Sequence, residues 1–363
     1  MGKIVPVSDL LVGRSNVDHS HYPVQMNRYP EFRYMGSKRR LLPWIHDILH
    51  RLDFESAWDP FSGSGCVSYL MKSMGKRVVS SDFLNFPSIF AKALIENPGK
   101  RLDGRTLKLL LKNPRTSHSF IEQTFSGIYF TPNDLTFLDR VSSNIHSIAD
   151  EHLKSIAMTA LLRSCLKKQP RGVFTITGDL SKYDDGRRDL RLSIEEHFFE
   201  QIEVVQEAVF KNGKSNKARK GDVFELPQQK VDLVYLDPPY VPRSDDNCYV
   251  KRYHFLEGLS CYWHGLEVDE STKTKKIPKR YTPFSYRRTA LEAFDQMFSR
   301  FKNKTIVLSY SSNAYPDLPQ LEDLLKRYKR SVRVFVKQHT YHFGNHANVD
   351  RSQTTEYLLV GLN

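Results

Sequence analysis

Residues 231–240 have the sequence VDLVYLDPPY, an apolar run that stops at a carboxylate, two prolines and an aromatic ring. Such a β-branched and aromatic run predicts a buried strand, and α/β sheets bind ligands at the carboxyl ends of their strands. Chemistry is therefore expected at the tetrapeptide Asp237, Pro238, Pro239 and Tyr240. The carboxylate and the Pro238 carbonyl can accept hydrogen bonds from an NH2 group, while the tyrosine stacks on the flat ring that holds it. The implied substrate group is a planar exocyclic amine.

The composition is that of a globular protein that can bury a substantial core. The chain has 363 residues, 40% of them hydrophobic, which suits one elaborated domain or two closely joined ones. No window approaches the roughly 20 apolar residues of a membrane span, and the first residues lack the apolar core of a signal peptide. We therefore expect a soluble, cytoplasmic protein with no membrane partner. The four cysteines show no metal-type spacing, so no metal site is expected.

The charge favours a polyanionic partner. Net charge is +13, from 54 Lys and Arg against 41 Asp and Glu. Residues 271–288 hold seven basic side chains and residues 211–220 hold five, with no acid in either run. These runs could be solvated loops, but with interleaved aromatics they predict contacts with the phosphates of a polyanionic partner. The candidate DNA-binding residues are Lys273, Lys275, Lys276, Lys279, Arg280, Arg287, Arg288, Lys217, Arg219 and Lys220.

Apolar periodicity predicts an α/β sheet that is interrupted by a long insertion. The expected strands are 55–59, 77–82, 231–237, 304–311, 331–341 and 355–362, and the expected sheet helices are 65–74, 289–301 and 318–330. The last two strands have no helix between them, which predicts a terminal β-hairpin. Residues 84–220 are richer in helical pattern and form the expected inserted subdomain. Residues 31–83 and 221–363 would form a discontinuous catalytic domain, after a loosely structured leader over residues 1–30.

A glycine-containing loop follows the first predicted strand. Residues 59–65 have the sequence DPFSGSG, in which glycines permit a tight turn and a close approach of ligand to backbone. The third glycine of a dinucleotide fingerprint is absent. Asp82 lies at the end of the next predicted strand, where an acid can bind ribose hydroxyls. A purine-ribose cofactor without a pyrophosphate fits this pattern better than NAD.

Four further features each leave an alternative open. Lys38, in the sequence FRYMGSK at residues 32–38, could neutralise a small carboxylate beside Tyr34, or Ser37 could simply cap a helix. The sequence GDVF at residues 221–224 could receive an adenine amino group or form an ordinary turn. The aromatic segment 249–255 could cover a flipped base or form a hydrophobic clasp. His339, His342 and His346 suggest a metal site, but without nearby cysteines structural or DNA-contacting roles are favoured.

Taken together, these motifs resemble those of the Dam-like adenine-specific DNA methyltransferases, in the same order along the chain. YMGSK at residues 34–38 resembles the family's N-terminal motif, residues 59–65 its cofactor loop and residues 237–240 its catalytic tetrapeptide. Residues 171–178 resemble, more loosely, the segment that ends the target-recognition insert. The resemblance implies a Rossmann-like S-adenosylmethionine-dependent methyltransferase sheet, with residues 84–220 as a mainly helical target-recognition subdomain.

The resemblance also implies roles for individual residues. Lys38 and Tyr34 would hold the methionine end of S-adenosylmethionine, Asp82 its ribose and Asp222 its adenine. The full set of expected cofactor residues is Tyr34, Met35, Gly36, Lys38, Asp59, Phe61, Gly63, Gly65, Asp82, Phe83, Asp222, Val223 and Asp237.

The expected reaction is transfer of a methyl group to N6 of an adenine flipped out of double-stranded DNA. Hydrogen bonds to Asp237 and Pro238 would direct the N6 lone pair towards the methyl group, and Tyr240 would stack on the base. A cognate restriction endonuclease is a candidate partner. Two alternatives remain open, which are methylation of another planar amine, such as cytosine N4 or an RNA base, and a non-catalytic DNA-binding role.

Overall fold

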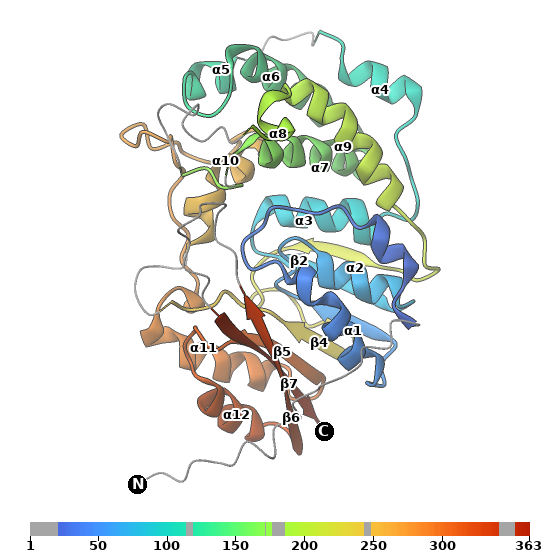
Figure 1. Ribbon diagram of the computed structural model, residues 1–363, viewed down its shortest axis with the longest axis vertical. Coiled ribbons are helices and arrows are strands. Elements are labelled where there is room, and N and C mark those ends of the chain that lie inside the picture. The colour runs from blue at the N-terminus through green and yellow to red at the C-terminus, as the bar shows by residue number, and fades with distance from the viewer. Residues whose placement is uncertain (1–20, 114–118, 171, 176–185, 243–247, 341–352) are drawn as a thin grey trace.

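A seven-stranded sheet forms the centre of the computed structural model, which describes residues 21–113, 119–170, 172–175, 186–242, 248–340 and 353–363 (Figure 1). The strand order is β3-β2-β1-β4-β5-β7-β6. The strands are β1 (Ser56–Asp59), β2 (Arg77–Asp82), β3 (Lys217–Lys220), β4 (Leu233–Leu236), β5 (Thr305–Ser311), β6 (Ser331–Thr340) and β7 (Gln353–Leu362). β7 is antiparallel to both β5 and β6, while the first five strands in this order are parallel. The predicted α/β class and terminal hairpin are therefore confirmed.

The two-residue period of the strands divides the sheet between two cores. In β4, Leu233 and Tyr235 belong to one hydrophobic cluster, while Val234 and Leu236 belong to the other. The first face is covered by α1 (Leu42–His50), α2 (Cys66–Ser73) and α3 (Asn85–Ala91), and the second by α11 (Arg287–Arg300) and α12 (Leu318–Lys326) (Figure 1). With both faces covered, the site lies at the carboxyl edge of the sheet.

The boundaries expected for the insertion differ from those in the structure. Residues 217–220 form β3, whose register pairs Val79 with Lys217 and Asp82 with Lys220, so they belong to the sheet. The polar sequence KARK gave no strand pattern, because an exposed edge strand needs no apolar face. α3 also packs against β2 and β3, so the helical subdomain begins only after α3 ends at Ala91.

The inserted subdomain is helical, as expected. Its helices are α4 (Gly104–Leu110), α5 (Phe120–Phe125), α6 (Pro132–His146), α7 (Glu151–Lys168), α8 (Arg188–Arg191) and α9 (Ile194–Ala208). α10 (Tyr249–Cys261), which comes from the expected catalytic segment, packs on this subdomain through Phe255. The Phe255 ring lies 4.9 Å from Phe125 and 5.0 Å from Phe174, measured between ring centroids. α10 therefore packs with the insertion, although it follows the tetrapeptide in the sequence.

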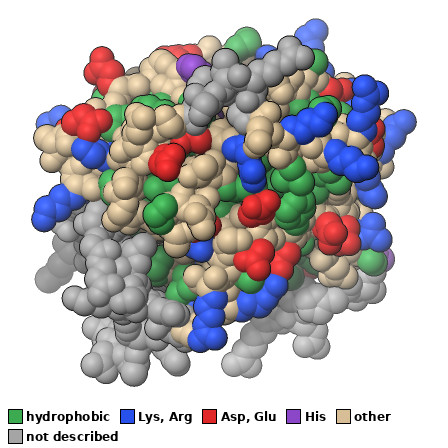
Figure 2. All heavy atoms as spheres, turned by 90° about the horizontal axis from the view of Figure 1, so that it is seen from above, with side chains coloured by type: hydrophobic (Ala, Val, Ile, Leu, Met, Phe, Trp, Pro, Cys, Tyr) green, Lys and Arg blue, Asp and Glu red, His purple; other side chains and the backbone are tan. Residues whose placement is uncertain are grey.

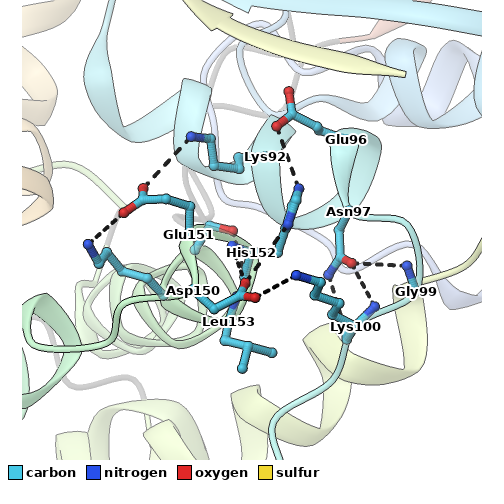
Figure 3. A network of polar contacts seen from close by, with 11 residues as sticks. Lys92, Glu96, Asn97, Gly99, Lys100, Asp150, Glu151, His152 and Leu153 are labelled. Atoms are coloured by element: carbon cyan, nitrogen blue, oxygen red, sulfur yellow. Dashed lines mark hydrogen bonds and ion pairs between the residues drawn. The ribbon is translucent and has the colours of Figure 1, made fainter. Parts of the chain in front are cut away.

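A polar network fastens the start of α7 to the sheet (Figure 3). Asp150 caps α7 by accepting the backbone N–H of His152 at 2.9 Å, and it pairs with Lys100. His152 lies 3.5 Å from the carboxylate of Glu96, and that carboxylate also accepts the backbone N–H of Ala218 in β3 at 2.7 Å. Because Glu96 is at the end of the π-helix η5 (Lys92–Glu96), one side chain connects the insertion to the edge strand.

The end of the expected leader is well packed, which corrects that expectation for residues 21–30. η3 (Val24–Arg28) lies against α2, where Gln25 donates to the Tyr69 hydroxyl at 2.7 Å. The buried Tyr29 donates its hydroxyl to the Ser64 carbonyl at 2.6 Å. These residues thus support the glycine loop. Residues 1–20 lie outside the described part of the chain.

None of the described helices is long and apolar enough to cross a membrane.

Candidate active site

A cavity of about 360 Å³ opens at the carboxyl ends of the parallel strands. The tetrapeptide, the glycine loop, the Tyr34–Lys38 segment and the turn at Asp222 all contribute to its wall. The expected site residues in this wall are Tyr34, Met35, Gly36, Lys38, Asp59, Phe61, Gly63, Asp82, Phe83, Asp222, Val223, Asp237, Pro238, Pro239 and Tyr240. Gly65 is the expected residue that does not line the cavity; it stands at the N-cap of α2. Motifs that are up to about 200 residues apart therefore meet around one space.

The glycine loop needs its glycine at position 63. Gly63 has a φ of +49°, and a Cβ placed there would lie 2.8 Å from the Tyr34 ring. Its backbone N–H donates to the Asp82 carboxylate at 2.9 Å. Gly65 has a φ of +78°, and a Cβ at this position would meet nothing within 4 Å, so backbone conformation alone favours glycine there.

Two acids beneath the loop are almost completely buried. Asp82 accepts the N–H groups of Gly63 and Leu84, each at 2.9 Å. Asp59 accepts the Ser68 hydroxyl at 2.7 Å through Oδ2, while its buried Oδ1 has no hydrogen-bond partner in the described residues. Burial raises the pKa of both carboxyls to about 7. A ligand with donor groups would satisfy the remaining acceptor capacity of these acids.

Tyr34 is fixed between aromatic rings of α10. It stacks on Tyr253 with ring centroids 5.1 Å apart and on Tyr249 at 5.8 Å. The Tyr253 hydroxyl also accepts the Met35 backbone N–H at 2.7 Å. Ser37 precedes the short 3-10 helix η4 (Lys38–Leu41) but makes no side-chain capping bond, so the structure gives no support to a capping role.

Lys38 pairs with Asp237 of the tetrapeptide. Its Nζ is 2.9 Å from Asp237 Oδ1, 3.1 Å from the Gly36 carbonyl and 4.5 Å from the Tyr240 ring centroid. The lysine is 2% exposed, so this cation is largely withdrawn from solvent. Burial raises the pKa of Asp237 to about 6, although Lys38 opposes this by favouring the carboxylate.

Tyr240 is held on its other sides by residues of β5 and β7. Its hydroxyl donates to Glu356 Oε2 at 2.9 Å. Its ring meets that of Tyr310 edge to face, with centroids 5.0 Å apart and planes at 72°. Strand β7 therefore contacts the tetrapeptide, which its expected place in a terminal hairpin did not indicate.

The turn at residues 221–224 has the contact of an ordinary polar turn and also lines the cavity. Asp222 Oδ1 accepts the Phe224 N–H at 2.8 Å, as in an ordinary polar turn, and Asp222 also lines the cavity. Val223 is buried beside it.

Sequence reasoning missed or left open several residues of the cavity wall. These are Ser37, Tyr249, Arg252, Thr282, Phe284, Ser311 and Asn313 among others. Of the aromatic segment 249–255, Tyr249 and Arg252 line the cavity, while Phe255 packs into the helical subdomain as a hydrophobic clasp would. Ser311 could have been found as the last residue of a parallel strand.

The candidate DNA-binding side chains are mostly exposed. Lys217, Arg219, Lys220, Lys273, Lys279, Arg280, Arg287 and Arg288 are exposed, whereas Lys275 and Lys276 are half-buried and Lys275 pairs with Glu270. Burial raises the pKa of Glu257, and Lys220 and Arg280, one from each run, partly oppose this rise by favouring its carboxylate form. Arg280 also lies 5.1 Å from the centroid of Phe83, which lines the cavity. By contrast, acidic and basic side chains are interspersed on the described part of the outer helical face (Figure 2).

Among the described residues, no group of three or more His, Cys, Asp and Glu side chains is arranged to hold a metal ion. His339 lies in β6, while His342 and His346 are outside the described part of the chain.

The strand order, with its antiparallel β7, and a cavity that joins a glycine loop to an Asp-Pro-Pro-Tyr tetrapeptide define an α/β methyltransferase. The family model of the D12 class N6 adenine-specific DNA methyltransferases matches residues 34–311. The chain belongs to this family and is therefore an N6 adenine-specific DNA methyltransferase.

Known proteins resemble the chain over almost its whole length. The Type II methyltransferase M2.HphI of Haemophilus parahaemolyticus is 29% identical over 346 residues, which cover 92% of this chain and 98% of that protein. The Type II methyltransferase M.NlaIII of Neisseria lactamica is 22% identical, with 90% and 98% covered. The modification methylase StsI of Streptococcus sanguinis is 26% identical over 90% of this chain, which spans only 51% of that relative.

Proposed function

We propose that the cavity binds S-adenosylmethionine and a flipped adenine side by side, and that the tetrapeptide at residues 237–240 aligns the adenine for methylation. The observation that supports this most directly is the convergence of the glycine loop and the tetrapeptide on one cavity. The cofactor supplies an electrophilic methyl group on a sulfonium. The residues around it must bind that cation, exclude water and orient the amine.

The charges of the cavity suit a cationic ligand. Asp59, Asp82 and Asp237 line it, whereas Lys38 is the buried lysine in the wall. Asp59 and Asp82 have a pKa of about 7, so near neutral pH burial alone leaves them only partly ionised. A positively charged ammonium and sulfonium would stabilise their charged forms. The unpartnered Oδ1 of Asp59 is our candidate acceptor for the ammonium group.

The remaining cofactor contacts are assigned from where the side chains lie around the cavity. Each carboxylate oxygen of Asp82 accepts one backbone N–H, which leaves acceptor capacity for ribose hydroxyls. Phe61, Phe83 and Val223 offer apolar surface to the adenine ring of the cofactor, and Asp222 lies beside them to receive its amino group. Lys38 is assigned to Asp237 rather than to the cofactor carboxylate, which changes the role expected from its motif.

At the reacting end, the N6 amine of adenine is a poor nucleophile because its lone pair is delocalised into the ring. Asp237 and the Pro238 carbonyl accept hydrogen bonds from its two N–H groups, which localises the lone pair towards the methyl group. Lys38 keeps Asp237 ionised and fixes the direction of its carboxylate. Tyr240 stacks on the base, so the transfer is direct and in line.

Double-stranded DNA is the proposed substrate, and the helical subdomain is the proposed target reader. Flipping a base costs a few kcal/mol in lost stacking, which phosphate contacts from the exposed arginines and lysines offset. Relatives of the chain are named modification methylases, which favours a protective role beside a cognate restriction endonuclease.

The cofactor assignment is tested by calorimetric titration of the purified protein with S-adenosylmethionine. We expect saturable binding of one cofactor per chain, retained by Asp237→Ala. Absence of binding by the wild-type protein, with DNA present or absent, would overturn it.

A further inference from the structure

Glu356 is a completely buried carboxylate that contacts the catalytic tyrosine from outside the known motifs. It lies in β7 opposite Ser311 of β5 and Lys337 of β6, and its side chain is 0% exposed. Isolated charges are costly to bury, so such a carboxylate needs a specific partner. The Tyr240 hydroxyl is such a partner, since it donates to Glu356 Oε2 at 2.9 Å.

The tyrosine ring is thereby fixed at three places. Glu356 holds its hydroxyl, Tyr310 meets the ring edge to face, and the Lys38 ammonium lies 4.5 Å from its centroid. The two prolines before Tyr240 restrict the backbone but leave the side-chain torsions free to change. The ring orientation is therefore set by these side-chain contacts.

We propose that Glu356 is a positioning residue for methyl transfer, which orients the Tyr240 ring so that it stacks on the flipped adenine. The proposal rests on the proposed function of Tyr240 and extends it to the C-terminal hairpin. Glu356 does not touch the base or the methyl group, and it acts through the phenol. Because β7 pairs with β5, whose last residue Ser311 lines the cavity together with Tyr240, the hairpin belongs to the support of this part of the wall.

The test compares single-turnover methylation of duplex DNA, at saturating labelled S-adenosylmethionine, between the wild-type chain and five variants. Glu356→Leu removes the acceptor, and Tyr240→Phe removes the donor while keeping the ring. We expect each to slow methyl transfer by about 10- to 100-fold, because a misplaced stacking ring loses alignment in the transition state. Glu356→Gln keeps an acceptor for the phenol and should stay within about 3-fold of the wild type. The cofactor dissociation constant should change little in all three.

Thr354→Val is the matched control for loosening of β7. Thr354 is buried two residues before Glu356, and its hydroxyl contacts Ser311 and Ser312. This variant should lower the melting temperature but leave the methylation rate near that of the wild type.

A double variant separates positioning from general damage. If Glu356 acts through the phenol, Tyr240→Phe with Glu356→Leu should be no slower than either single variant. The proposal would be overturned if the rate losses of the two single variants multiplied in the double variant. It would also be overturned if Glu356→Leu methylated at the wild-type rate, or if Thr354→Val slowed methylation as much as Glu356→Leu. If Glu356→Leu does not fold, an unchanged rate in Tyr240→Phe overturns it alone. Failure of the wild-type chain to methylate adenine would instead count against the proposed function.

Discussion

The Nζ of Lys38 lies 2.9 Å from Oδ1 of Asp237, so the N-terminal motif and the tetrapeptide share one largely buried ion pair. Breaking a buried pair by removing one partner leaves an uncompensated charge. The lysine is therefore expected to control whether Asp237 is ionised, in addition to forming part of the cavity wall.

This relationship predicts the pH dependence of methylation. Asp237 has a pKa raised to about 6 by burial, and it accepts the amine only when ionised, so activity should be lost as the pH falls through about 6. Lys38→Met removes the cation that favours the carboxylate, so the acidic limb of the rate profile should move to higher pH. Lys38→Arg keeps the charge and should keep the limb nearer its original place. An acidic limb that stays fixed in Lys38→Met would show that another group controls it.

Gly63 and Gly65 form a matched pair for the cofactor loop. Gly63→Ala combines a φ of +49° with a Cβ 2.8 Å from the Tyr34 ring, whereas Gly65→Ala meets open space. We expect Gly63→Ala to weaken cofactor binding by more than about 10-fold and to cost about 1–3 kcal/mol in stability. Gly65→Ala should cost about 1 kcal/mol from backbone strain and change cofactor affinity far less. Calorimetry and urea denaturation measure both quantities; equal effects on affinity would contradict the assigned geometry.

Asp59 is expected to lower the stability of the cofactor-free protein and to strengthen cofactor binding. Burial raises its folded-state pKa from the ordinary value of 3.8 to about 7, so the folded protein binds the proton more tightly than the unfolded chain. The resulting penalty on the cofactor-free protein builds up as the pH rises from about 4 to about 7. Asp59→Asn should therefore raise the melting temperature at pH 8 by a few degrees, or about 1 kcal/mol, with little gain at pH 4. Its affinity for S-adenosylmethionine should fall at least about 10-fold, because an amide does not offset the ammonium charge.

Asp232, directly before the amino end of β4, supplies a control whose pKa shift has the opposite sign to that of Asp59. Burial raises the pKa of its carboxyl, but hydrogen bonds from Ser56 and from the Glu55 and Ser56 N–H groups outweigh this and lower the pKa. Asp232→Asn should lower the melting temperature at pH 8 and leave cofactor affinity unchanged. The Asp59 account fails if both asparagine variants shift stability in the same direction.

The exposed arginines at the start of α11 predict the salt dependence of DNA binding. Each phosphate contact contributes close to one unit to the slope of log affinity against log salt concentration. Changing both Arg287 and Arg288 to Gln should therefore reduce this slope by about 2, with equal losses on unrelated sequences. Lys302→Gln removes an exposed charge just before β5, at the opposite edge of the sheet, and should leave the slope unchanged. If the slope of the double variant equals that of the wild type, residues 287 and 288 do not contact phosphates.

The parts of the fold with strong apolar periodicity could be predicted from the sequence. Strand β4 ends directly before Asp237, and the expected hairpin of residues 331–341 and 355–362 corresponds to β6 and β7. Edge strand β3 could not be predicted, because its sequence KARK has no buried face and its pairing with β2 depends on a distant part of the chain.

The same distinction applies to the site. The cavity-lining positions of the glycine loop and tetrapeptide follow from local motifs, because parallel strands bring their carboxyl ends to one edge. Glu356 gave no local signal, since a single acid within an apolar strand pattern reaches Tyr240 only after β7 pairs with β5. The ion pair between Lys38 and Asp237 joins positions that are 199 residues apart. The motifs alone assigned Lys38 to the cofactor and Asp237 to the target amine.

The central claim is that this cavity places N6 of adenine against Asp237. The most direct measurement incubates duplex DNA with the protein and S-adenosylmethionine labelled in its methyl group, digests the DNA to nucleosides and identifies the labelled nucleoside by mass spectrometry. We predict N6-methyldeoxyadenosine with the wild-type chain, and loss of this product with Asp237→Ala although cofactor binding persists. Label on cytosine N4, or methylation of adenine by Asp237→Ala at the wild-type rate, would contradict the account.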